Sequence, residues 1–517
     1  MEPILTTPAA LRRAAQTWPD GVAVVDDQWG DPPTVELTWS EFAEEVRTFA
    51  AALVASGIAA GDRVAIWSPN SHHWPVAALG THYAGATLVP LNTRYTSTEA
   101  VEIIERSAAR AVIVSGAFLG GDHLAELVES HADSLPGVVV GVTLDGSSAV
   151  PDIAIEWSEF LARATETTRD EADARADAVA PEDISDILFT SGTTGKSKGV
   201  LAEHQQTMSG SQAWGANGHL SSDDRYLMVN PYFHTFGYKA GILPCTLFGA
   251  TMIPLAVYSP TEAMALAERR KATVFPGAPT IFQTILDDPA RADHDLSSLR
   301  LIVTGAAIVP VVLIERLQSD LGVDTVVTAY GLTEASGFVS TCTPDDDDET
   351  VANTCGRAFA GMEIALSEEG EVLARGKMVM RGYLDDETAT KETIDADGWL
   401  HTGDIGRIDE RGNLTITDRL KDMYICGGFN VYPAEVEQTL ARLDGVTESA
   451  VIGVPDERLG EVGRAFLTVR DGVTLDEASV IAYAKEHLAN FKVPRSVVVV
   501  DAFPRNAAGK ILKRQLS

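Results

Sequence analysis

The chain has 517 residues, 45% of them hydrophobic and 22% charged, a composition typical of globular proteins. It is too long for a single hydrophobic core, so we expect two or more domains. Its 74 acidic residues outnumber 40 basic ones, for a formal net charge of −34. Such a surface repels nucleic acids and anionic membranes, which argues against both as partners. A polyanionic ligand must therefore be held by locally placed basic side chains and backbone N–H groups.

Cysteine spacing and apolar segments indicate where in the cell the protein is expected. The four cysteines lie far apart without a CxxC pair, which predicts free thiols rather than a zinc site or disulfides. No signal peptide is expected at the N-terminus, and the apolar run 301–314 is interrupted and too short for a membrane helix. We expect a cytoplasmic protein without a stable membrane anchor.

Short β-branched runs alternate with amphipathic stretches along the first 330 residues. The runs expected to form strands are 64–67, 87–91, 111–115, 138–142, 184–189, 226–229, 273–275, 301–304 and 325–329. Helices are expected at 98–107, 262–272 and 311–319. This alternation predicts parallel sheets with crossover helices, and the continuous apolar strands predict that both sheet faces are covered.

The pattern changes after about residue 365. Turn residues at 370–371 and 410–413 predict hairpins of a small β region. The residues from 433 predict a compact α+β unit, with helices at 434–442 and 476–488 and strands near 450–454, 465–469 and 496–500. We predict an α/β fold with a large N-terminal domain, residues 1–418, and a small C-terminal α+β domain, residues 419–517.

The most informative segment is the run TSGTTGKSKG at 190–199, which directly follows the strand expected at 184–189. Its glycines allow close backbone approach, its hydroxyls can hydrogen-bond, and its lysines supply positive charge, so it predicts a phosphate-binding loop. It differs from the common GxxxxGK[ST] loop, because Thr190 stands where the first glycine would be.

Four further motifs follow in order: YGLTE at 330–334, HTGD at 401–404, DRLKD at 418–422 with GGFNVYP at 427–433, and NAAGKI at 506–511. Together with the phosphate loop they resemble the adenylate-forming superfamily of acyl-CoA synthetases, luciferases and peptide-synthetase adenylation domains. The resemblance spans essentially the whole chain. It implies that ATP and a carboxylic acid form acyl-AMP and pyrophosphate, and that the thiol of coenzyme A then displaces AMP. Mg²⁺ is the implied metal.

The resemblance also implies roles for individual residues in the nucleotide site. The residues that would hold the phosphates are Thr190, Ser191, Gly192, Thr193, Thr194 and Lys196. The residues that would surround the adenine are Tyr330, Gly331, Gly305, Ala306 and Ala307. Glu334 and Thr194 would bind Mg²⁺, and Thr333 would contact the α-phosphate. Asp404, helped by Arg419, would bind the ribose hydroxyls.

The C-terminal domain is implied to be mobile. Lys510 would be its catalytic lysine and would bridge the substrate carboxylate and the α-phosphate, where negative oxygens crowd together. Lys421 would be the hinge, and Gly427 and Gly428 would line the pantetheine tunnel. Glu334, Thr333 and His234 complete the catalytic group, with His234 bordering the acyl site.

The acid is harder to predict than the reaction. His234-Thr235-Phe236 stand where peptide-synthetase domains usually place an aspartate, which argues against an amino acid. The chain looks closest to bacterial synthetases that activate ring-bearing propanoates from steroid degradation, so we predict a bicyclic indane-dione propanoate. A medium- or long-chain fatty acid CoA ligase, an acyl-AMP ligase loading a carrier protein, and a nucleotide-binding regulator without chemistry are the alternatives.

Two further questions stay open at this point. Lys239 could contact a ketone of the acid, or it could pair with a carboxylate or face solvent. The resemblance is compatible with both a monomer and a homodimer.

Overall fold

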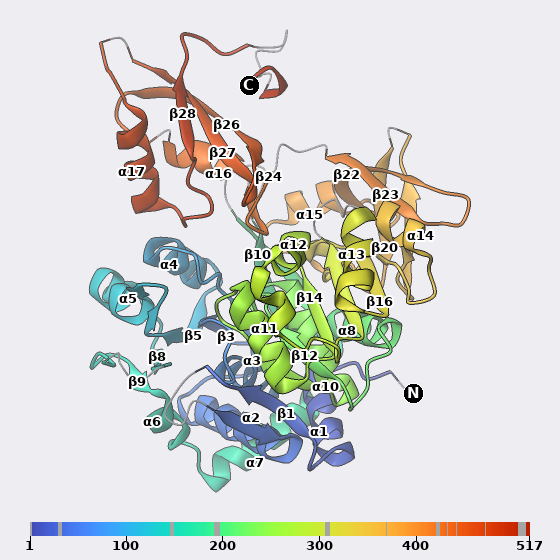
Figure 1. The fold of residues 1–517 in the computed structure, drawn as a ribbon. Helices are drawn as coiled ribbons and strands as arrows, with labels where there is room; N and C mark the ends of the chain where they lie inside the picture. The colour runs from blue at the N-terminus through green and yellow to red at the C-terminus, as the bar shows by residue number, and fades with distance from the viewer. Residues whose placement is uncertain are drawn as a thin grey trace.

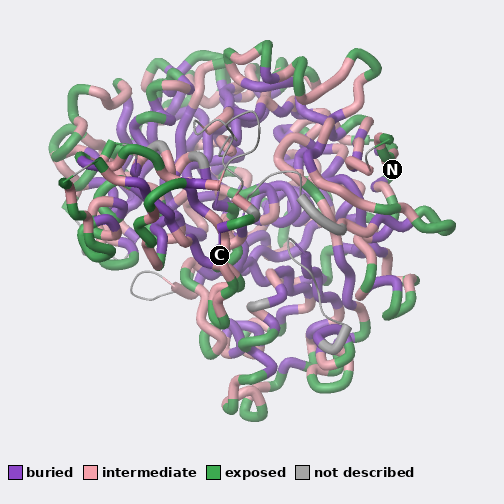
Figure 2. Tube along the Cα trace, turned by 90° about the horizontal axis from the view of Figure 1, so that it is seen from above, coloured by how far each residue is buried: buried purple, intermediate pink, exposed green. Residues whose placement is uncertain are grey.

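The computed structural model describes residues 3–28, 34–144, 149–190, 197–305, 311–368, 370–419, 424–431, 433–440, 442–470, 472–504 and 513–516. Two large sheets lie side by side with helices packed between and around them, and a smaller unit near the C-terminus stands apart from them (Figure 1). Residues of both large sheets, such as Val64 and Tyr226, belong to one continuous hydrophobic core. Figure 2 shows this buried interior with the exposed residues on the loops around it.

The first large sheet has the strand order β18-β17-β16-β15-β14-β12-β13-β1-β2. Its central strands are parallel, whereas β2, β17 and β18 pair antiparallel at the two edges. The bounds are β1 Val22–Asp26, β2 Val35–Thr38, β12 Arg225–Met228, β13 Thr251–Pro254, β14 Val274–Gly277, β15 Leu301–Gly305, β16 Thr325–Tyr330, β17 Ser340–Thr341 and β18 Arg357–Ala358.

The second large sheet has the order β21-β11-β10-β4-β3-β5-β8-β9. It is parallel from β10 to β9, and β11 and β21 are antiparallel. The bounds are β3 Arg63–Trp67, β4 Thr87–Pro90, β5 Ala109–Ser115, β8 Val138–Val142, β9 Ile155–Glu156, β10 Ile184–Thr190, β11 Lys198–Glu203 and β21 Gly382–Tyr383. A short hairpin joins β6 Ala117–Phe118 to β7 Gly121–Asp122.

Helices cover both sheets. They are α1 Thr7–Thr17, α2 Trp39–Ala55, α3 His73–Tyr83, α4 Ser97–Arg106, α5 His123–His131, α6 Trp157–Leu161, α7 Glu166–Ala178, α8 His204–Asn217, α9 Thr235–Gly237, α10 Leu243–Phe248, α11 Pro260–Arg270, α12 Pro279–Asp287, α13 Val311–Leu321, α14 Asp348–Asn353 and α15 Glu387–Thr393. Shorter turns are η1 Ala132–Ser134, η2 Tyr238–Ile242, η3 Pro289–Asp293 and η4 Thr333–Ala335, of which η2 is a π-helical turn.

Helix α3 is buried along nearly its whole length, from Trp74 to Tyr83. It packs against α2 and α7, and its residues belong to the same core as the residues of both sheets. A helix that is buried on all sides has no solvent face and therefore no amphipathic period. This explains why the pattern of apolar residues does not predict it.

An antiparallel sheet of order β19-β20-β22-β23 follows the two large sheets. The bounds are β19 Met362–Leu366, β20 Glu371–Gly376, β22 Leu400–Ile408 and β23 Leu414–Arg419. We call the described residues up to 419 the large unit.

The described residues from 424 to 516, the C-terminal unit, form a further sheet in which β25-β24-β27-β26 are antiparallel and β28 pairs parallel with β27. The bounds are β24 Tyr424–Cys426, β25 Phe429–Val431, β26 Val446–Asp456, β27 Gly460–Val469, β28 Ser496–Val499, α16 Pro433–Leu440, α17 Glu477–His487 and η5 Lys513–Gln515. This unit has its own core, which includes Val436, Val451 and Ala484.

The predicted fold class is confirmed, and each strand or helix named in the sequence analysis has a counterpart in the structure. The antiparallel edge strands were not predicted. The division between residues 418 and 419 falls inside β23 and stays a prediction.

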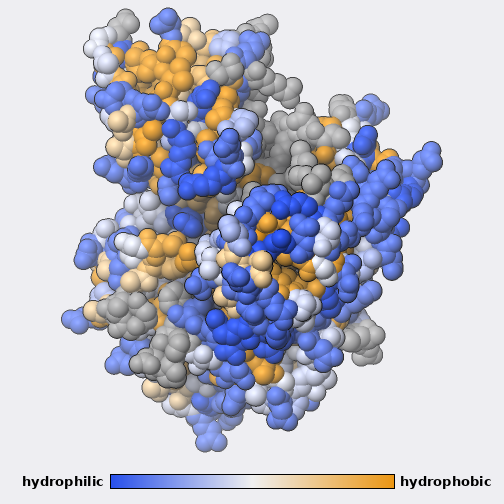
Figure 3. All heavy atoms as spheres, in the orientation of Figure 1, coloured by the Kyte–Doolittle hydropathy of each residue, from blue (hydrophilic) through white to orange (hydrophobic). Residues whose placement is uncertain are grey.

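The surface fits the acidic composition. Figure 3 shows a face that is mostly hydrophilic, with apolar patches that include one on the C-terminal unit. Val498 and Val499 on β28 are among the exposed large apolar residues. No helix within the described ranges is long and apolar enough to cross a membrane.

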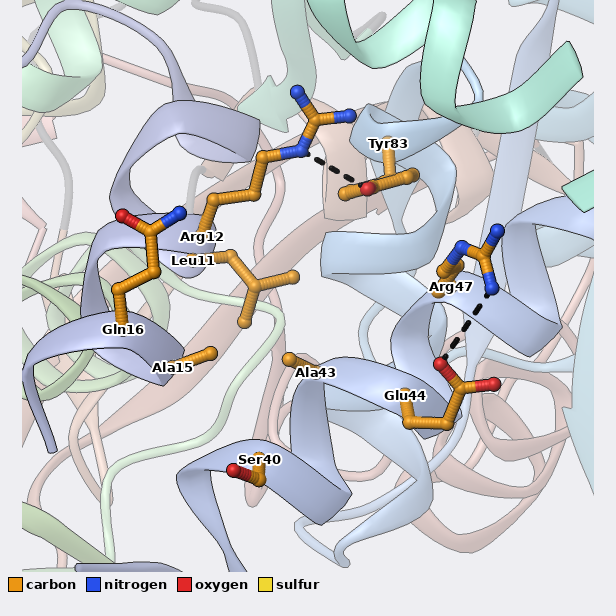
Figure 4. A pocket seen from close by; sticks show the side chains of 9 residues that line it. All are labelled: Leu11, Arg12, Ala15, Gln16, Ser40, Ala43, Glu44, Arg47 and Tyr83. Atoms are coloured by element: carbon orange, nitrogen blue, oxygen red, sulfur yellow. Dashed lines mark hydrogen bonds and ion pairs between the residues drawn. The ribbon is translucent and has the colours of Figure 1, made fainter. Parts of the chain in front are cut away.

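A surface pocket opens between α1, α2 and α3 (Figure 4). Its lining residues are Leu11, Arg12, Ala15, Gln16, Ser40, Ala43, Glu44, Arg47 and Tyr83. Tyr83 accepts a hydrogen bond from Arg12 and donates one to Asp173 on α7, and Arg47 also pairs with Asp173. These contacts dock α7 against α1 to α3, and the pocket contains none of the predicted site residues.

Candidate active site

The ends of β15 and β16 bring two predicted adenine-site residues together. Gly305 ends β15 and lies opposite Ala329 on β16, which ends one residue later at Tyr330. A Cβ on Gly305 would lie 2.6 Å from the carbonyl oxygen of Ala329, so a side chain there would force the two strands apart. Because parallel strands end at the same edge of a sheet, this is where an open α/β sheet places its ligand.

A tight loop follows Tyr330. A Cβ on Gly331 would lie 1.9 Å from the carbonyl oxygen of Gly337, so the loop closes only with glycine at this position. The turn η4, which carries Thr333 and Glu334, lies between these two glycines. A Cβ on Gly337 would lie 3.0 Å from the Cβ of Thr235, so this loop packs against the segment that begins at His234.

The predicted ribose residue reaches the same place from another sheet. Tyr330 donates a hydrogen bond from Oη to Oδ2 of Asp404 on β22, at 2.6 Å. The backbone of Asp404 is fixed in turn, because its N–H donates to Thr402 Oγ1 and Thr402 donates to the carbonyl of Val372. Arg419 lies directly opposite Asp404 on β23. Tyr330, predicted to bind the adenine, and Asp404, predicted to bind the ribose, therefore lie at one site, with the backbone of Arg419 next to them.

Glu334 is linked to the base of the phosphate loop through Tyr383, a residue that the sequence analysis missed. Tyr383 donates a hydrogen bond from Oη to Glu334 Oε1 at 2.8 Å. Its strand, β21, pairs with β11, and the ammonium of Lys198 lies 4.7 Å from the centre of its ring. Lys198 lies opposite Thr190, so the two residues flank the loop between them. No local pattern distinguishes Tyr383, because its role depends on pairing between distant strands.

His234 lies at the start of α9 and is solvent-accessible. Its Nδ1 accepts a hydrogen bond from the backbone N–H of Phe236 at 3.3 Å. Although the residue is exposed, the surrounding protein atoms reduce the hydration of the ring, which lowers the pKa of His234 below its usual value. The imidazole is therefore neutral at pH 7, with Nδ1 occupied as an acceptor.

Lys239 does not face solvent and has a carboxylate partner. Its ammonium lies 2.9 Å from Oδ1 of Asp186, and both side chains are essentially inaccessible. The other oxygen of Asp186 accepts hydrogen bonds from Ser185 and Thr207. Of the three possibilities raised by the sequence, the structure shows pairing with a carboxylate. The ion pair joins β10, which leads into the phosphate loop, to the turn η2 that follows His234 and α9.

Gly427 and Gly428 form the two-residue tip of the hairpin between β24 and β25. Both are exposed and have positive φ angles, +58° and +84°, which glycine adopts without strain. The hairpin is part of the C-terminal unit.

The remaining predicted site residues lie outside the described residues. They are Ser191, Gly192, Thr193, Thr194 and Lys196 of the phosphate loop, Ala306 and Ala307 after β15, Lys421, and Lys510. The side chain of Arg419 is likewise not described.

Two family models match the chain: AMP-binding enzyme over residues 11–384 and AMP-binding enzyme C-terminal domain over residues 435–510. The chain belongs to this family. It is 58% identical to a 3-[(3aS,4S,7aS)-7a-methyl-1,5-dioxo-octahydro-1H-inden-4-yl]propanoyl:CoA ligase from Rhodococcus jostii, over 99% of this chain and 98% of that protein. A ligase of the same name from Mycobacterium tuberculosis matches with the same identity and coverage.

Among solved structures, o-succinylbenzoate CoA synthetase from Bacillus subtilis resembles this AMP-binding enzyme in two complexes. A double mutant bound to its product analogue OSB-NCoA gives a TM-score of 0.84, and the complex with the acyl-adenylate intermediate OSB-AMP gives 0.67. Both comparisons have 26% identity and cover 98% of this chain and 97% of the other.

We predict that Tyr383→Phe lowers kcat/KM for ATP by about tenfold, because loss of a hydrogen bond to a carboxylate costs about 1.5 kcal/mol and frees Glu334 to move. Steady-state kinetics at varied ATP tests this. Tyr258→Phe is the matched control, since Tyr258 also donates from Oη, but to the remote carbonyl of Ile281. Equal kinetics for the two variants would show that the Tyr383 bond has no part in activity.

We predict that Lys239→Met lowers the free energy of unfolding by about 3–5 kcal/mol, because Asp186 is left buried without its counter-charge. Urea unfolding measures the loss. The double variant with Asp186→Asn is expected to recover part of it, since the buried charge is then gone. A variant with unchanged stability and an altered preference among acids would instead indicate that Lys239 serves substrate recognition.

Proposed function

We propose that this acyl-CoA synthetase joins coenzyme A to a bicyclic indane-dione propanoate: the acid and ATP form acyl-AMP and pyrophosphate, and the thiol of coenzyme A then displaces AMP. The observation that carries the substrate is the 58% identity, along nearly the full length of both chains, to two ligases named for that acid. The reaction class agrees with the family and with the convergence of Tyr330, Asp404 and Glu334 at one sheet edge. A cytoplasmic location and a homodimer stay predictions.

The chemistry requires a carboxylate to attack a phosphate of like charge. We assign Tyr330 to the adenine and Asp404 to the ribose, because their hydrogen bond places both where β16 ends. Thr333 is assigned to the α-phosphate, and the loop after Thr190 to the β- and γ-phosphates. His234, neutral at pH 7, borders the acyl group without adding a charge to it. Donors and cations held in place before the reaction stabilise the charge that develops on the phosphate oxygens.

The residues present fit Mg²⁺. No cluster of three or more His, Cys, Asp or Glu able to hold a metal occurs in the described part of the chain. Mg²⁺ bound with a nucleotide needs one or two carboxylates, since phosphates and water provide its other ligands. Glu334, oriented by Tyr383, is that carboxylate, and Thr194 is a second predicted ligand. When bound, the ion would neutralise phosphate charge.

We infer that the structure has the arrangement used for thioester formation. The same B. subtilis enzyme matches with a TM-score of 0.84 when it holds a CoA product analogue and 0.67 when it holds the adenylate. Coverage and identity are equal, so the difference lies in how the parts of the molecule are arranged. In this arrangement the hairpin tip at Gly427 and Gly428 would line the path of the pantetheine arm, and Lys510 would serve the other half-reaction after rotation about Lys421.

The substrate is tested by incubating the enzyme with ATP, Mg²⁺, CoA and one acid at a time. The acids are the indane-dione propanoate, fatty acids of several lengths, and aromatic acids, and products are identified by mass. We expect the propanoate to give the highest kcat/KM. Preference for a fatty acid would favour a fatty acid CoA ligase. Pyrophosphate release without any CoA thioester would favour transfer to a carrier protein.

Lys510→Ala is expected to abolish acyl-AMP formation, measured as pyrophosphate release, and to leave CoA-thioester formation from supplied acyl-AMP nearly intact. The reason is that the ammonium is needed where carboxylate and phosphate oxygens meet, and not when a thiol displaces AMP. Lys485→Ala, an exposed lysine on α17 of the same unit, serves as control. Equal losses in both half-reactions would contradict the assignment.

A further inference from the structure

The C-terminal unit meets the large unit at the segment that leads into α4. The guanidinium of Arg94 lies 6.0 Å from the centre of the Phe429 ring, and Phe429 stacks on Phe491 with ring centres 4.6 Å apart. Next to this stack, the ammonium of Lys492 lies 4.6 Å from the centre of the Tyr95 ring. Figure 1 shows the C-terminal unit above α4, with α17 on the side nearest to that helix. The hairpin whose tip is Gly427 and Gly428 therefore contacts the large unit through Phe429.

Lys492 is buried between two carboxylates from different units. Its side chain is 4% exposed, and Nζ donates to Glu99 Oε1 at 2.9 Å and to Glu435 Oε1 at 2.6 Å. Glu435 lies on α16 of the C-terminal unit, so this bond moves with Lys492. Glu99 lies on α4 of the large unit, so its bond to Lys492 exists only while the two units are in this arrangement.

The side chain of Glu99 is held in place by hydrogen bonds within the large unit, independently of Lys492. Its other oxygen, Oε2, accepts hydrogen bonds from the backbone N–H and the hydroxyl of Thr96, at 2.9 and 3.1 Å, and so caps the N-terminus of α4. The cap leaves Oε1 directed at the C-terminal unit. The carboxylate therefore loses little side-chain freedom when the ammonium binds, which makes the contact more favourable than one between two mobile side chains.

We propose that Glu99 and Lys492 are positioning residues that hold the C-terminal unit in the thioester-forming arrangement. This inference rests on the proposed function, and specifically on the arrangement inferred from the two TM-scores. The pair must separate when the unit rotates to bring Lys510 to the acid and ATP. Lys492 then still pairs with Glu435 of its own unit, so its positive charge retains a partner. Glu99 no longer pairs with the ammonium of Lys492. The pair thus favours the second half-reaction over the first.

The test is Glu99→Gln. Glutamine preserves the cap, because its amide oxygen can accept from Thr96, but it presents an NH₂ group to the ammonium instead of an oxygen. Glu41→Gln is the matched control: Glu41 caps α2 through Thr38 with the same pair of hydrogen bonds, at 2.9 and 2.9 Å, and is exposed at the surface. A general effect of the substitution on a capping box would appear in both variants.

We expect Glu99→Gln to slow thioester formation from supplied indane-dione propanoyl-AMP and CoA by about tenfold, a change at the low end of measured couplings between close charge pairs across interfaces. Acyl-AMP formation without CoA, measured as pyrophosphate release, is expected to be unchanged or faster. Because that half-reaction requires folded enzyme, it also reports whether the variant folds. In a Lys492→Met background, Glu99→Gln is expected to change neither rate further.

Three results would overturn the proposal: equal loss in both half-reactions, no loss of thioester formation, or loss confined to acyl-AMP formation. An additive effect of Glu99→Gln in the Lys492→Met background would also overturn it, since the two residues would then act independently. Failure of the proposed function is a separate result, because the unmodified enzyme would then form no thioester from this acid.

Discussion

Three carboxylates in and next to the candidate site each have a hydrogen-bond or ion-pair partner, and the arrangement of the site depends on these pairs. Asp404 accepts from Tyr330, Glu334 accepts from Tyr383, and Asp186 is paired with Lys239. A chain of net charge −34 that binds a nucleotide must keep its own negative charges in place, because a displaced carboxylate would repel the phosphates. Hydroxyl donors orient Asp404 and Glu334 without neutralising them, so both can still take part in binding. Where the carboxylate is fully buried, as at Asp186, the partner is an ammonium.

The same principle applies between the units. Lys492 is buried with Glu99 and Glu435, and the burial raises the pKa of Glu435 while the two carboxylates raise the pKa of Lys492. The shift at Lys492 favours the charged ammonium in this arrangement, whereas the shift at Glu435 opposes ionisation of that carboxyl. An interface built mainly on apolar area would hold the units together in one arrangement, whereas an ion pair beside a small aromatic stack can be broken and reformed. Such an interface suits an enzyme in which one unit must serve two half-reactions in turn.

Sequence reasoning was successful where function depends on contiguous residues or on repeated pattern. The strands that carry Gly305, Tyr330 and Thr190 were predicted from apolar runs, and the motifs at 330–334 and 401–404 do lie together. It did not find Tyr383, whose contact with Glu334 requires β21 to pair with β11 some 180 residues earlier. It did not predict α3, since a helix buried on all sides shows no amphipathic period. Lys239 was left open for a similar reason: the partner of a buried charge is set by packing, not by neighbours in sequence.

The sequence by itself determined the fold class, the family and the order of the motifs along the chain, because apolar period, turn residues and loop composition are local properties. Only the tertiary structure decided which carboxylate each of Tyr330, Tyr383 and Lys239 contacts, and that Lys492 bridges the two units. Those contacts join residues 49 to 393 positions apart, so their formation depends on strand order and on how the units are arranged in space. The physical reason is that hydrogen bonds and ion pairs act over a few ångströms. The spacing of apolar residues along the sequence does not show which distant residues come within that range.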